Sequence, residues 1–192
     1  MKRTILTIVA IVAAILIVTG CATSIPITDA NREVNNFRFN NGAISWQKVF
    51  QFNGQDYVAV RDWFNKSFIV TRENESSIIG ETSENTLPIQ EAGFDRLAVT
   101  MLMTYPCVVY FSTDFKDDRY RVTVNRIIWH PNIGITTYGV TNTIGAMDLN
   151  ELALKGNAYN SVFYNTSSVQ LDAMLSHLFT AKLNNTDTND EW

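Results

Sequence analysis

The sequence has few of the residues from which catalytic and metal sites are usually built. Only two histidines and two cysteines occur in its 192 residues. Neither His130 nor His177 has a histidine or cysteine at metal-ligand spacing, which argues against a zinc site. The sequence also has no Gly-x-Ser-x-Gly elbow, phosphate-binding loop or Gly-x-Gly-x-x-Gly motif. We therefore expect no cofactor, no metal ion and no enzymatic activity.

The chain also has no excess of positive charge. The chain has 15 Lys and Arg against 19 Asp and Glu, a net charge of −4. Lys2 and Arg3 lie in a segment that we expect to be removed, and without them 13 basic side chains face 19 acidic ones. A net acidic domain argues against a nucleic-acid partner and against electrostatic attachment to anionic lipid.

The first 20 residues have the pattern of an export signal. Two basic residues precede an uncharged apolar run from Ile5 to Val18. The following Val18-Thr19-Gly20-Cys21 resembles a bacterial lipobox, which implies that residues 1–20 are a cleaved signal peptide and that Cys21 carries the lipid. The alternative is an uncleaved transmembrane helix, but the uncharged stretch from Thr4 to Gly20 has 17 residues, at the short end of the roughly 17–25 needed to span a bilayer.

Lipidation of Cys21 predicts a protein anchored at the cell envelope. Three acyl chains exceed the two signals needed for stable anchoring. Ala22 rather than Asp follows the cysteine, and the resemblance to a sorting rule of some diderm bacteria favours the outer membrane over the inner. Residues 21–43 are expected to be a tether. The expected partners are the membrane, through the lipid, and an envelope protein or small ligand.

Residues 44–184 are predicted to form one α+β domain. The predicted elements are a strand near residues 46–52, a helix over 55–66, a hairpin over 68–81, a strand from about Ala98, a long hairpin over 105–129, and a helix from Ser167 or Ser168. We expect an antiparallel sheet of about five or six strands with helices packed on one face. Residues 133–164 show no sustained period, and residues 185–192 are expected to be disordered.

The long hairpin has two arms joined by Lys116-Asp117-Asp118. Side chains alternate along a strand, so the second arm divides into two faces. Strict alternation places Tyr120, Val122, Val124 and Ile128 on the core face, and Arg119, Arg121, Thr123 and Asn125 on the face toward water. Cys107 lies in the apolar first arm and is interpreted as a small core residue.

Three motifs resemble a bacterial exported domain-of-unknown-function family with a TBP-like fold. They are the helix Tyr57-Val58-Ala59-Val60-Arg61-Asp62-Trp63-Phe64, the acidic turn into Ile78-Ile79-Gly80, and the turn Lys116-Asp117-Asp118-Arg119-Tyr120-Arg121. The family usually has glycine where this chain has Asp118. The resemblance covers about residues 44–130 and the C-terminal helix, and it implies the TBP-like fold. Because fold does not imply function, it implies no activity and no DNA binding.

Aromatic and basic residues of the long hairpin are the candidate binding residues. They are Tyr110, Arg119, Tyr120, Arg121, Arg126 and Trp129. On a sheet face that no helix covers, such residues are typical of a binding surface. The alternative is that the aromatic residues belong to the core and the arginines to a solvated face.

Asp114, Asp117 and Asp118 form the one tight carboxylate cluster before the tail. They support an alternative hypothesis, a hydrolase of a cell-envelope polymer, which requires that they converge in a cleft. Aspartate is also common in turns for structural reasons. A third possibility is assembly through an edge strand. The favoured interpretation is a non-catalytic binding or accessory module that uses a sheet face.

We expect Cys21→Ser to lose membrane association, because serine has no sulfur to carry the lipid. Ultracentrifugation of cell extracts measures the loss as transfer of the protein from the membrane pellet to the supernatant. A variant that still sediments with membranes would contradict the lipobox interpretation.

Overall fold

The computed structural model describes residues 23–52, 56–131, 133–137 and 140–182. Its strands are β1 (Ser24–Pro26), β2 (Glu33–Val34), β3 (Phe37–Asn40), β4 (Ala43–Gln51), β5 (Ile69–Asn74), β6 (Ser77–Glu81), β7 (Cys107–Lys116), β8 (Arg119–Trp129), β9 (Ile133–Thr137), β10 (Val140–Ile144), β11 (Met147–Asp148), β12 (Leu154–Lys155) and β13 (Ala158–Asn160). Its helices are α2 (Tyr57–Ser67), α3 (Leu149–Ala153) and α4 (Ser168–Phe179), with a 3₁₀ turn η1 (Met101–Thr104) and a π-helical turn η2 (Phe163–Ser167). In these ranges no helix is long and apolar enough to cross a membrane.

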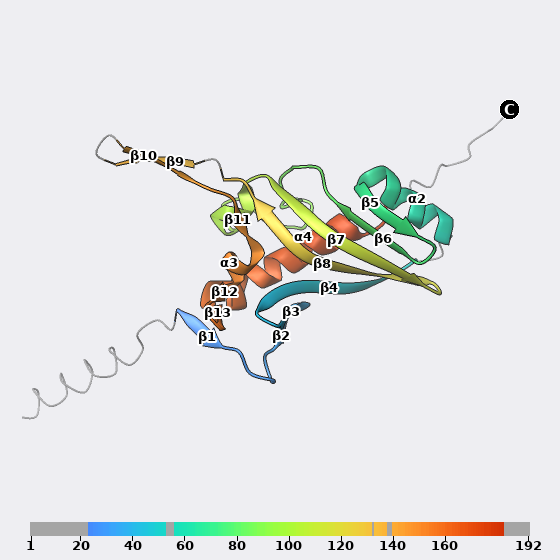
Figure 1. Cartoon of the computed structure of the whole chain (residues 1–192), viewed down its shortest axis with the longest axis horizontal. Helices are drawn as coiled ribbons and strands as arrows, with labels where there is room; N and C mark the ends of the chain where they lie inside the picture. The colour runs from blue at the N-terminus through green and yellow to red at the C-terminus, as the bar shows by residue number, and fades with distance from the viewer. Residues whose placement is uncertain (1–22, 53–55, 132, 138–139, 183–192) are drawn as a thin grey trace, which may run out of the picture.

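An antiparallel sheet of eight strands forms the centre of the molecule (Figure 1). Seven strands follow the order β2-β3-β4-β8-β7-β6-β5, and β11 pairs with β8 beyond that path. The predicted α+β class with an antiparallel sheet is therefore confirmed, whereas five or six strands is too few. The additional strands have two to four residues, too few to show an alternating pattern in the sequence.

Two smaller sheets accompany the main one. β1, β13 and β12 form a three-stranded sheet, and β9 and β10 form a two-stranded sheet that extends away from the body of the molecule (Figure 1). Residues 101–104 form η1 rather than the strand predicted from Ala98, because local hydrogen bonds such as Met103 N to Thr100 O, at 2.9 Å, satisfy the backbone there.

Residues 24–40 belong to the fold, so the tether predicted over 21–43 is wrong for this part. β3 pairs with β4, and β1 pairs with β13. Phe37 is fully buried, with its ring centroid 5.2 Å from that of Phe163. The predicted signal peptide, Cys21 and the predicted tail at 185–192 lie outside the described residues.

Two tight turns explain why this segment resembles a linker in the sequence. Asn35 and Asn36 both have positive φ between β2 and β3, and Asn41 and Gly42 do so between β3 and β4. Such turns match the twist of antiparallel strands, and asparagine and glycine adopt them readily. The polar residues that look like a tether are therefore the corners of two hairpins.

A β-bulge in β8 decides which side chains reach the core. Phe111 pairs with Val124 and the preceding Tyr110 pairs with Arg126, so Asn125 has no opposite residue. Asn125 and Arg126 are both exposed, and the buried positions shift by one. The buried residues of β8 are Tyr120, Val122, Val124, Ile127 and Trp129. The prediction that Ile128 faces the core is wrong for this reason.

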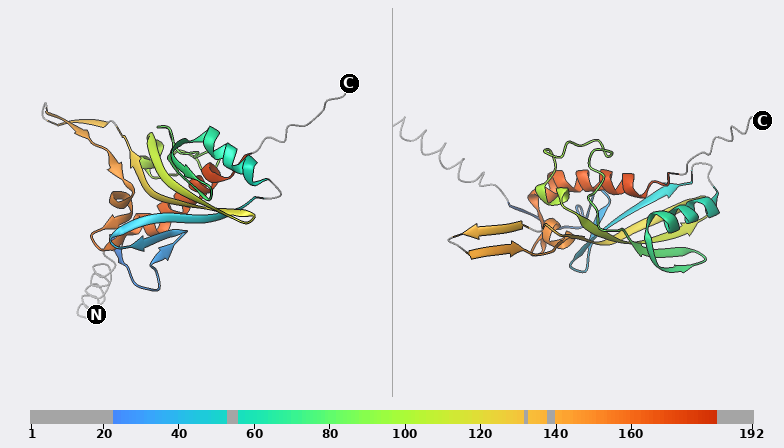
Figure 2. Two further views of the ribbon diagram at one scale, coloured as in Figure 1. Left: turned by 45° about the vertical axis from the view of Figure 1, so that its right-hand side comes forward. Right: turned by 90° about the horizontal axis from the view of Figure 1, so that it is seen from above.

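Helices α2 and α4 pack on the same face of the main sheet, as predicted, and Figure 2 shows α4 lying along it. The side chain of Asp56 caps α2 by accepting a hydrogen bond from Val58 N. Phe64 of α2 and Phe179 of α4 both contact Phe111 of the sheet, at ring-centroid distances of 6.0 and 5.0 Å. Both helices therefore share one aromatic core.

Asp172 connects α4 to the N-terminal part of the sheet. Its Oδ1 accepts hydrogen bonds from Trp46 Nε1 at 2.8 Å and from Asn36 Nδ2 at 2.9 Å. Its Oδ2 lies 3.5 Å from Lys48 Nζ, which also donates to Ser176 Oγ at 2.6 Å. One carboxylate thus satisfies the indole of a fully buried tryptophan and fixes the helix against β4 and the first hairpin turn.

We expect Asp172→Ala to lower the free energy of unfolding by about 2 kcal/mol, because it leaves the buried Trp46 indole N–H without an acceptor. Urea unfolding followed by tryptophan fluorescence measures the change. The matched control is Asp62→Ala on the exposed side of α2, with an expected change within about 0.5 kcal/mol. Equal stability of the two variants would contradict the anchoring role of Asp172.

Candidate functional site

The face of β4, β8, β7 and β6 that lies opposite α2 and α4 is the open sheet face. Cross-strand pairing arranges its side chains in rows. One row contains Val49, Arg121, Asp114 and Ser77, and a neighbouring row ends with the pair Arg119 and Lys116. Alternation along each strand places these residues on one surface.

Four of the six predicted binding residues lie on the open sheet face, namely Tyr110, Arg119, Arg121 and Arg126. The other two do not. Tyr120 is 2% exposed and Trp129 is 0% exposed, both on the core face of β8. Tyr120 precedes the bulge, and alternation alone places it on the core face. The bulge at Asn125 explains Trp129, because it brings this odd-numbered residue to the same side as Tyr120 and moves Arg126 to the side of Arg121.

Positive charge gathers on the open sheet face although the chain as a whole is acidic. Lys116, Arg119, Arg121 and Arg126, hereafter the basic patch, are all exposed. Asp114 and Glu81 are the carboxylates that alternation places on the same face of β7 and β6, which leaves an excess of two positive charges. Arg121 Nη2 lies 2.8 Å from Asp114 Oδ2. Both side chains are about half exposed, so this ion pair contributes at most about 1 kcal/mol.

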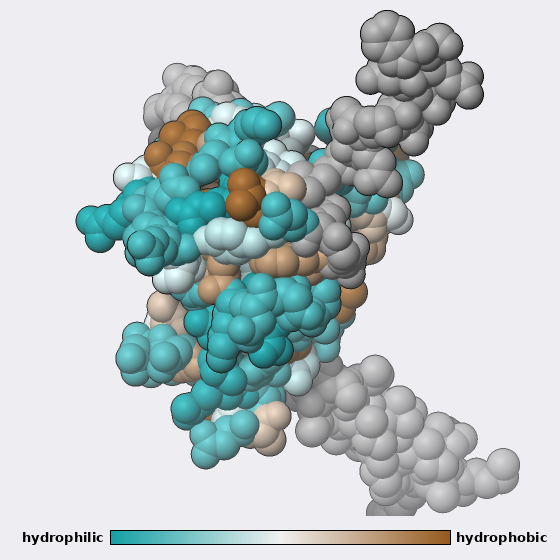
Figure 3. Space-filling view, turned by 90° about the vertical axis from the view of Figure 1, so that its right-hand side faces the viewer, coloured by the Kyte–Doolittle hydropathy of each residue, from teal (hydrophilic) through white to brown (hydrophobic). Residues whose placement is uncertain are grey.

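A hollow of about 410 Å³ opens at the hairpin end of this face. It is lined by Val49, Ser76, Asp114, Phe115, Lys116, Arg119 and Arg121. Figure 3 shows this end of the molecule, where hydrophilic residues dominate and apolar residues form small separate groups. The hollow therefore offers guanidinium and ammonium groups around one half-exposed valine.

Sequence reasoning missed Val49 and Lys116 as members of this surface. Lys116 was assigned to the turn, but alternation from Tyr110 through Ser112 and Asp114 would have placed it on the open face. No comparable signal marks Val49, because its position follows from the register between β4 and β8, which the sequence does not specify.

The three predicted carboxylates are not gathered in one cleft. Asp114 lines the hollow and pairs with Arg121, whereas Asp117 and Asp118 are exposed residues of the turn. Asp117 takes the left-handed conformation with φ 54°, and the backbone oxygen of Asp118 accepts from Phe52 N at 2.8 Å. Among the described residues no group of three His, Cys, Asp or Glu side chains is placed to hold a metal ion.

The edge of the main sheet is irregular at β5. A bulge lies between Val70 and Arg72, and the hydroxyl of Thr71 donates to the backbone oxygen of Ile79 at 3.1 Å. Bulges and charged side chains are features that discourage pairing with another strand. The regular edge that assembly by strand addition requires is therefore not found in β5.

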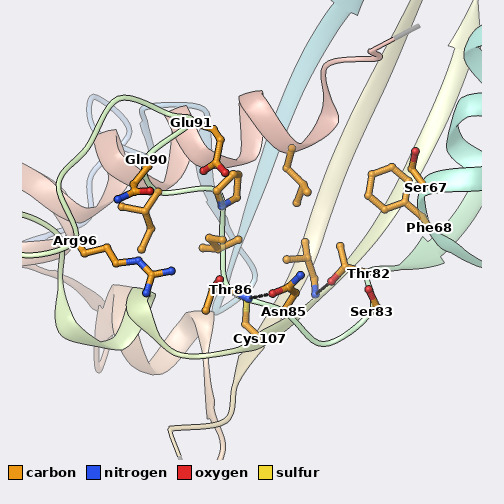
Figure 4. Close-up of a pocket in the computed structure, with 15 residues that line it drawn as sticks. Ser67, Phe68, Thr82, Ser83, Asn85, Thr86, Gln90, Glu91, Arg96 and Cys107 are labelled. Carbon is orange, nitrogen blue, oxygen red and sulfur yellow. Dashed lines mark hydrogen bonds between the residues drawn. The ribbon is translucent and has the colours of Figure 1, made fainter. Parts of the chain in front are cut away.

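A second cavity, of about 400 Å³, lies between the segment 82–96 and α4 (Figure 4). Apolar residues that include Phe68, Ile89 and Cys107 line it together with the side chains of Thr86 and Arg96. Figure 4 shows Arg96 pointing across the cavity toward Thr86. Hydroxyl, amide and guanidinium groups over an apolar floor can hold a small polar molecule.

Cys107 in this floor is not a nucleophile. It is almost fully buried, and burial, with a smaller effect from the charge of Glu84, raises the pKa of its thiol to about 12. A thiol must ionise to attack or to bind a metal, so at neutral pH the side chain acts as a small apolar residue. The interpretation of Cys107 as a core residue is confirmed.

Comparisons with known proteins give similarity in structure alone. No protein-family model matches the chain, and no curated protein matches it. The crystal structure of a TBP-like protein from Parabacteroides distasonis aligns with a TM-score of 0.39 and 10% identity, covering 75% of this chain and 97% of that one. A DUF4468 family protein from Bacteroides ovatus aligns with a TM-score of 0.42 and 13% identity, covering 81% and 98%. One neighbour is described as TBP-like, but similarity at this level assigns no function.

We expect Cys107 to react roughly a thousandfold more slowly with iodoacetamide in the native state than in denaturant at pH 8, because the raised pKa suppresses the thiolate. In the Cys21→Ser chain it is the one thiol, so mass spectrometry of labelled protein measures it directly. Labelling at similar rates in both states would contradict its burial.

Proposed function

We propose that this chain is a non-catalytic, lipid-anchored envelope protein that binds an acidic segment of a partner protein through the basic patch. The lipid on Cys21 provides the anchor, and the outer membrane is the favoured location. One observation carries the binding proposal. Four exposed cations share an uncovered sheet face in a chain whose net charge is −4.

The side chains of the basic patch favour the carboxylate groups of a protein as their ligand. A guanidinium group binds a carboxylate through two parallel hydrogen bonds, so three arginines on one face suit a run of acidic side chains. Tyr110 and the half-exposed Val49 add contact area between the charges. Arginine and tyrosine are enriched in protein interfaces, whereas lysine is depleted there.

The acidic remainder of the chain increases the selectivity of such a surface. A partner that is acidic throughout would be repelled by the rest of the domain, while one acidic segment would be steered to the basic patch. Anchoring both proteins in one envelope also raises their effective concentration, so a modest affinity is sufficient.

A photo-crosslinking amino acid at position 49 tests the proposal in intact cells. The matched control carries it at position 58, because Val58 is similarly exposed but lies on α2, opposite the open sheet face. We expect a crosslinked partner from position 49 and none of the same size from position 58.

The double substitution Arg119→Gln and Arg121→Gln should reduce the yield of that crosslink about tenfold, because it removes two of the charges that hold the carboxylates. Lys66→Gln with Arg96→Gln is the charge-matched control at exposed positions on the helix side of the sheet, with little expected loss. An equal yield from both double variants would contradict recognition through the basic patch.

A further inference from the structure

Large apolar side chains are exposed near the point where the described fold begins. Leu97 is 95% exposed and Met101 is 64% exposed, and Val162 and Val169 are each about half exposed. These four residues are hereafter the apolar patch. Single exposed apolar residues are common, but a group of them indicates a contact surface.

Hydrogen bonds show that the segment with Leu97 and Met101 lies next to Val169, and Val162 precedes Val169 in the continuous helical segment of η2 and α4. Thr100 Oγ1 lies 2.7 Å from Ser167 Oγ, and Gln170 Nε2 donates to Ala98 O at 2.9 Å. The segment 97–101 therefore lies against the start of α4, two residues from Val169. The turn is fixed locally as well, because Asp95 Oδ1 accepts from Leu97 N at 2.9 Å. Leu97 is thus held in an exposed position by its own turn.

The N-terminal end of the described chain is attached to the same region. Ser161 N donates to Thr23 O at 3.3 Å, and Ser161 directly precedes Val162. Lys155 Nζ also donates to Thr23 Oγ1 at 2.8 Å. Cys21 lies two residues before Thr23, and two residues of chain reach at most about 7 Å. A lipid on Cys21 would therefore hold the apolar patch close to the bilayer surface.

We propose that the apolar patch is a membrane-docking surface that inserts Leu97 and Met101 into the lipid interface beside the lipidated Cys21. The inference rests on the lipid anchor of the proposed function. Apolar side chains that extend from a polar surface partition into the headgroup boundary, and Lys155 next to Thr23 suits the phosphates there.

This docking would point the basic patch away from the membrane. Figure 1 shows β1 and the tip of the β7–β8 hairpin at opposite ends of the molecule. A ten-residue strand such as β7 spans about 33 Å. The hairpin would therefore present Lys116, Arg119 and Arg121 to a partner well above the lipid surface.

The test uses the full-length lipidated protein in vesicles of phosphatidylethanolamine and phosphatidylglycerol. An NBD fluorophore is attached to Leu97→Cys, and separately to Val58→Cys as the control, because Val58 is an exposed valine on α2. Cys107 is buried, so it does not compete for the label. We expect aqueous iodide to quench the probe at position 97 about threefold more slowly than the probe at position 58, because lipid shields it.

The outcomes separate this inference from the anchor on which it rests. Equal quenching at both positions in vesicle-bound protein would overturn the docking surface and leave the lipid anchor intact. Protein that does not float with the vesicles would overturn both. The labelled Cys21→Ser chain without vesicles is the reference. Slow iodide quenching at position 97 in this reference sample would show that copies of the chain cover the apolar patch. That result would also overturn membrane docking.

Discussion

One unpaired residue, Asn125, sets the character of both faces of the main sheet. Without the bulge, β8 would keep strict alternation, and Trp129 would leave the core while Arg126 entered it. Burial of an unpaired guanidinium in an aromatic core costs several kcal/mol, and exposure of the indole loses most of its burial energy. The bulge at Asn125 therefore keeps the core apolar along the whole of β8 and places the arginines on the opposite face.

The sequence predicted the elements that show a sustained local pattern and missed those that show none. Helix α2, the hairpin of β5 and β6, and the long hairpin all have local periodicity and turn signals, and all are present. β2, β3 and β11 are too short to show a period. β2 and β3 form two consecutive hairpins with β4, whereas β11 pairs with the end of β8 across the intervening β9–β10 hairpin. The turn at Asn41-Gly42 was the available signal for β3.

The candidate site shows the same division. Arg119 and Arg121 were placed correctly by alternation alone, since they precede the bulge. Trp129 was misplaced because one inserted residue reverses the faces of every position after it. A bulge leaves little trace in composition. Alternation therefore predicts the correct face for residues before Asn125 and the wrong face for residues after it.

Helix α4 joins the two ends of the molecule into one rigid unit. The first turns of α4 contact the segment 97–101, and Asp172 in the middle of the helix bonds to Trp46 of β4. At its end, the buried hydroxyl of Tyr120 donates to Phe179 O at 2.8 Å and accepts from Ala181 N at 3.1 Å. Burial raises the pKa of Tyr120 to about 12, so the hydroxyl keeps the proton that it donates. Because Tyr120 lies between Arg119 and Arg121 in β8, the contact that ends the helix also fixes the backbone that carries the basic patch. A partner would meet these arginines on a preorganised strand, with little loss of backbone entropy on binding.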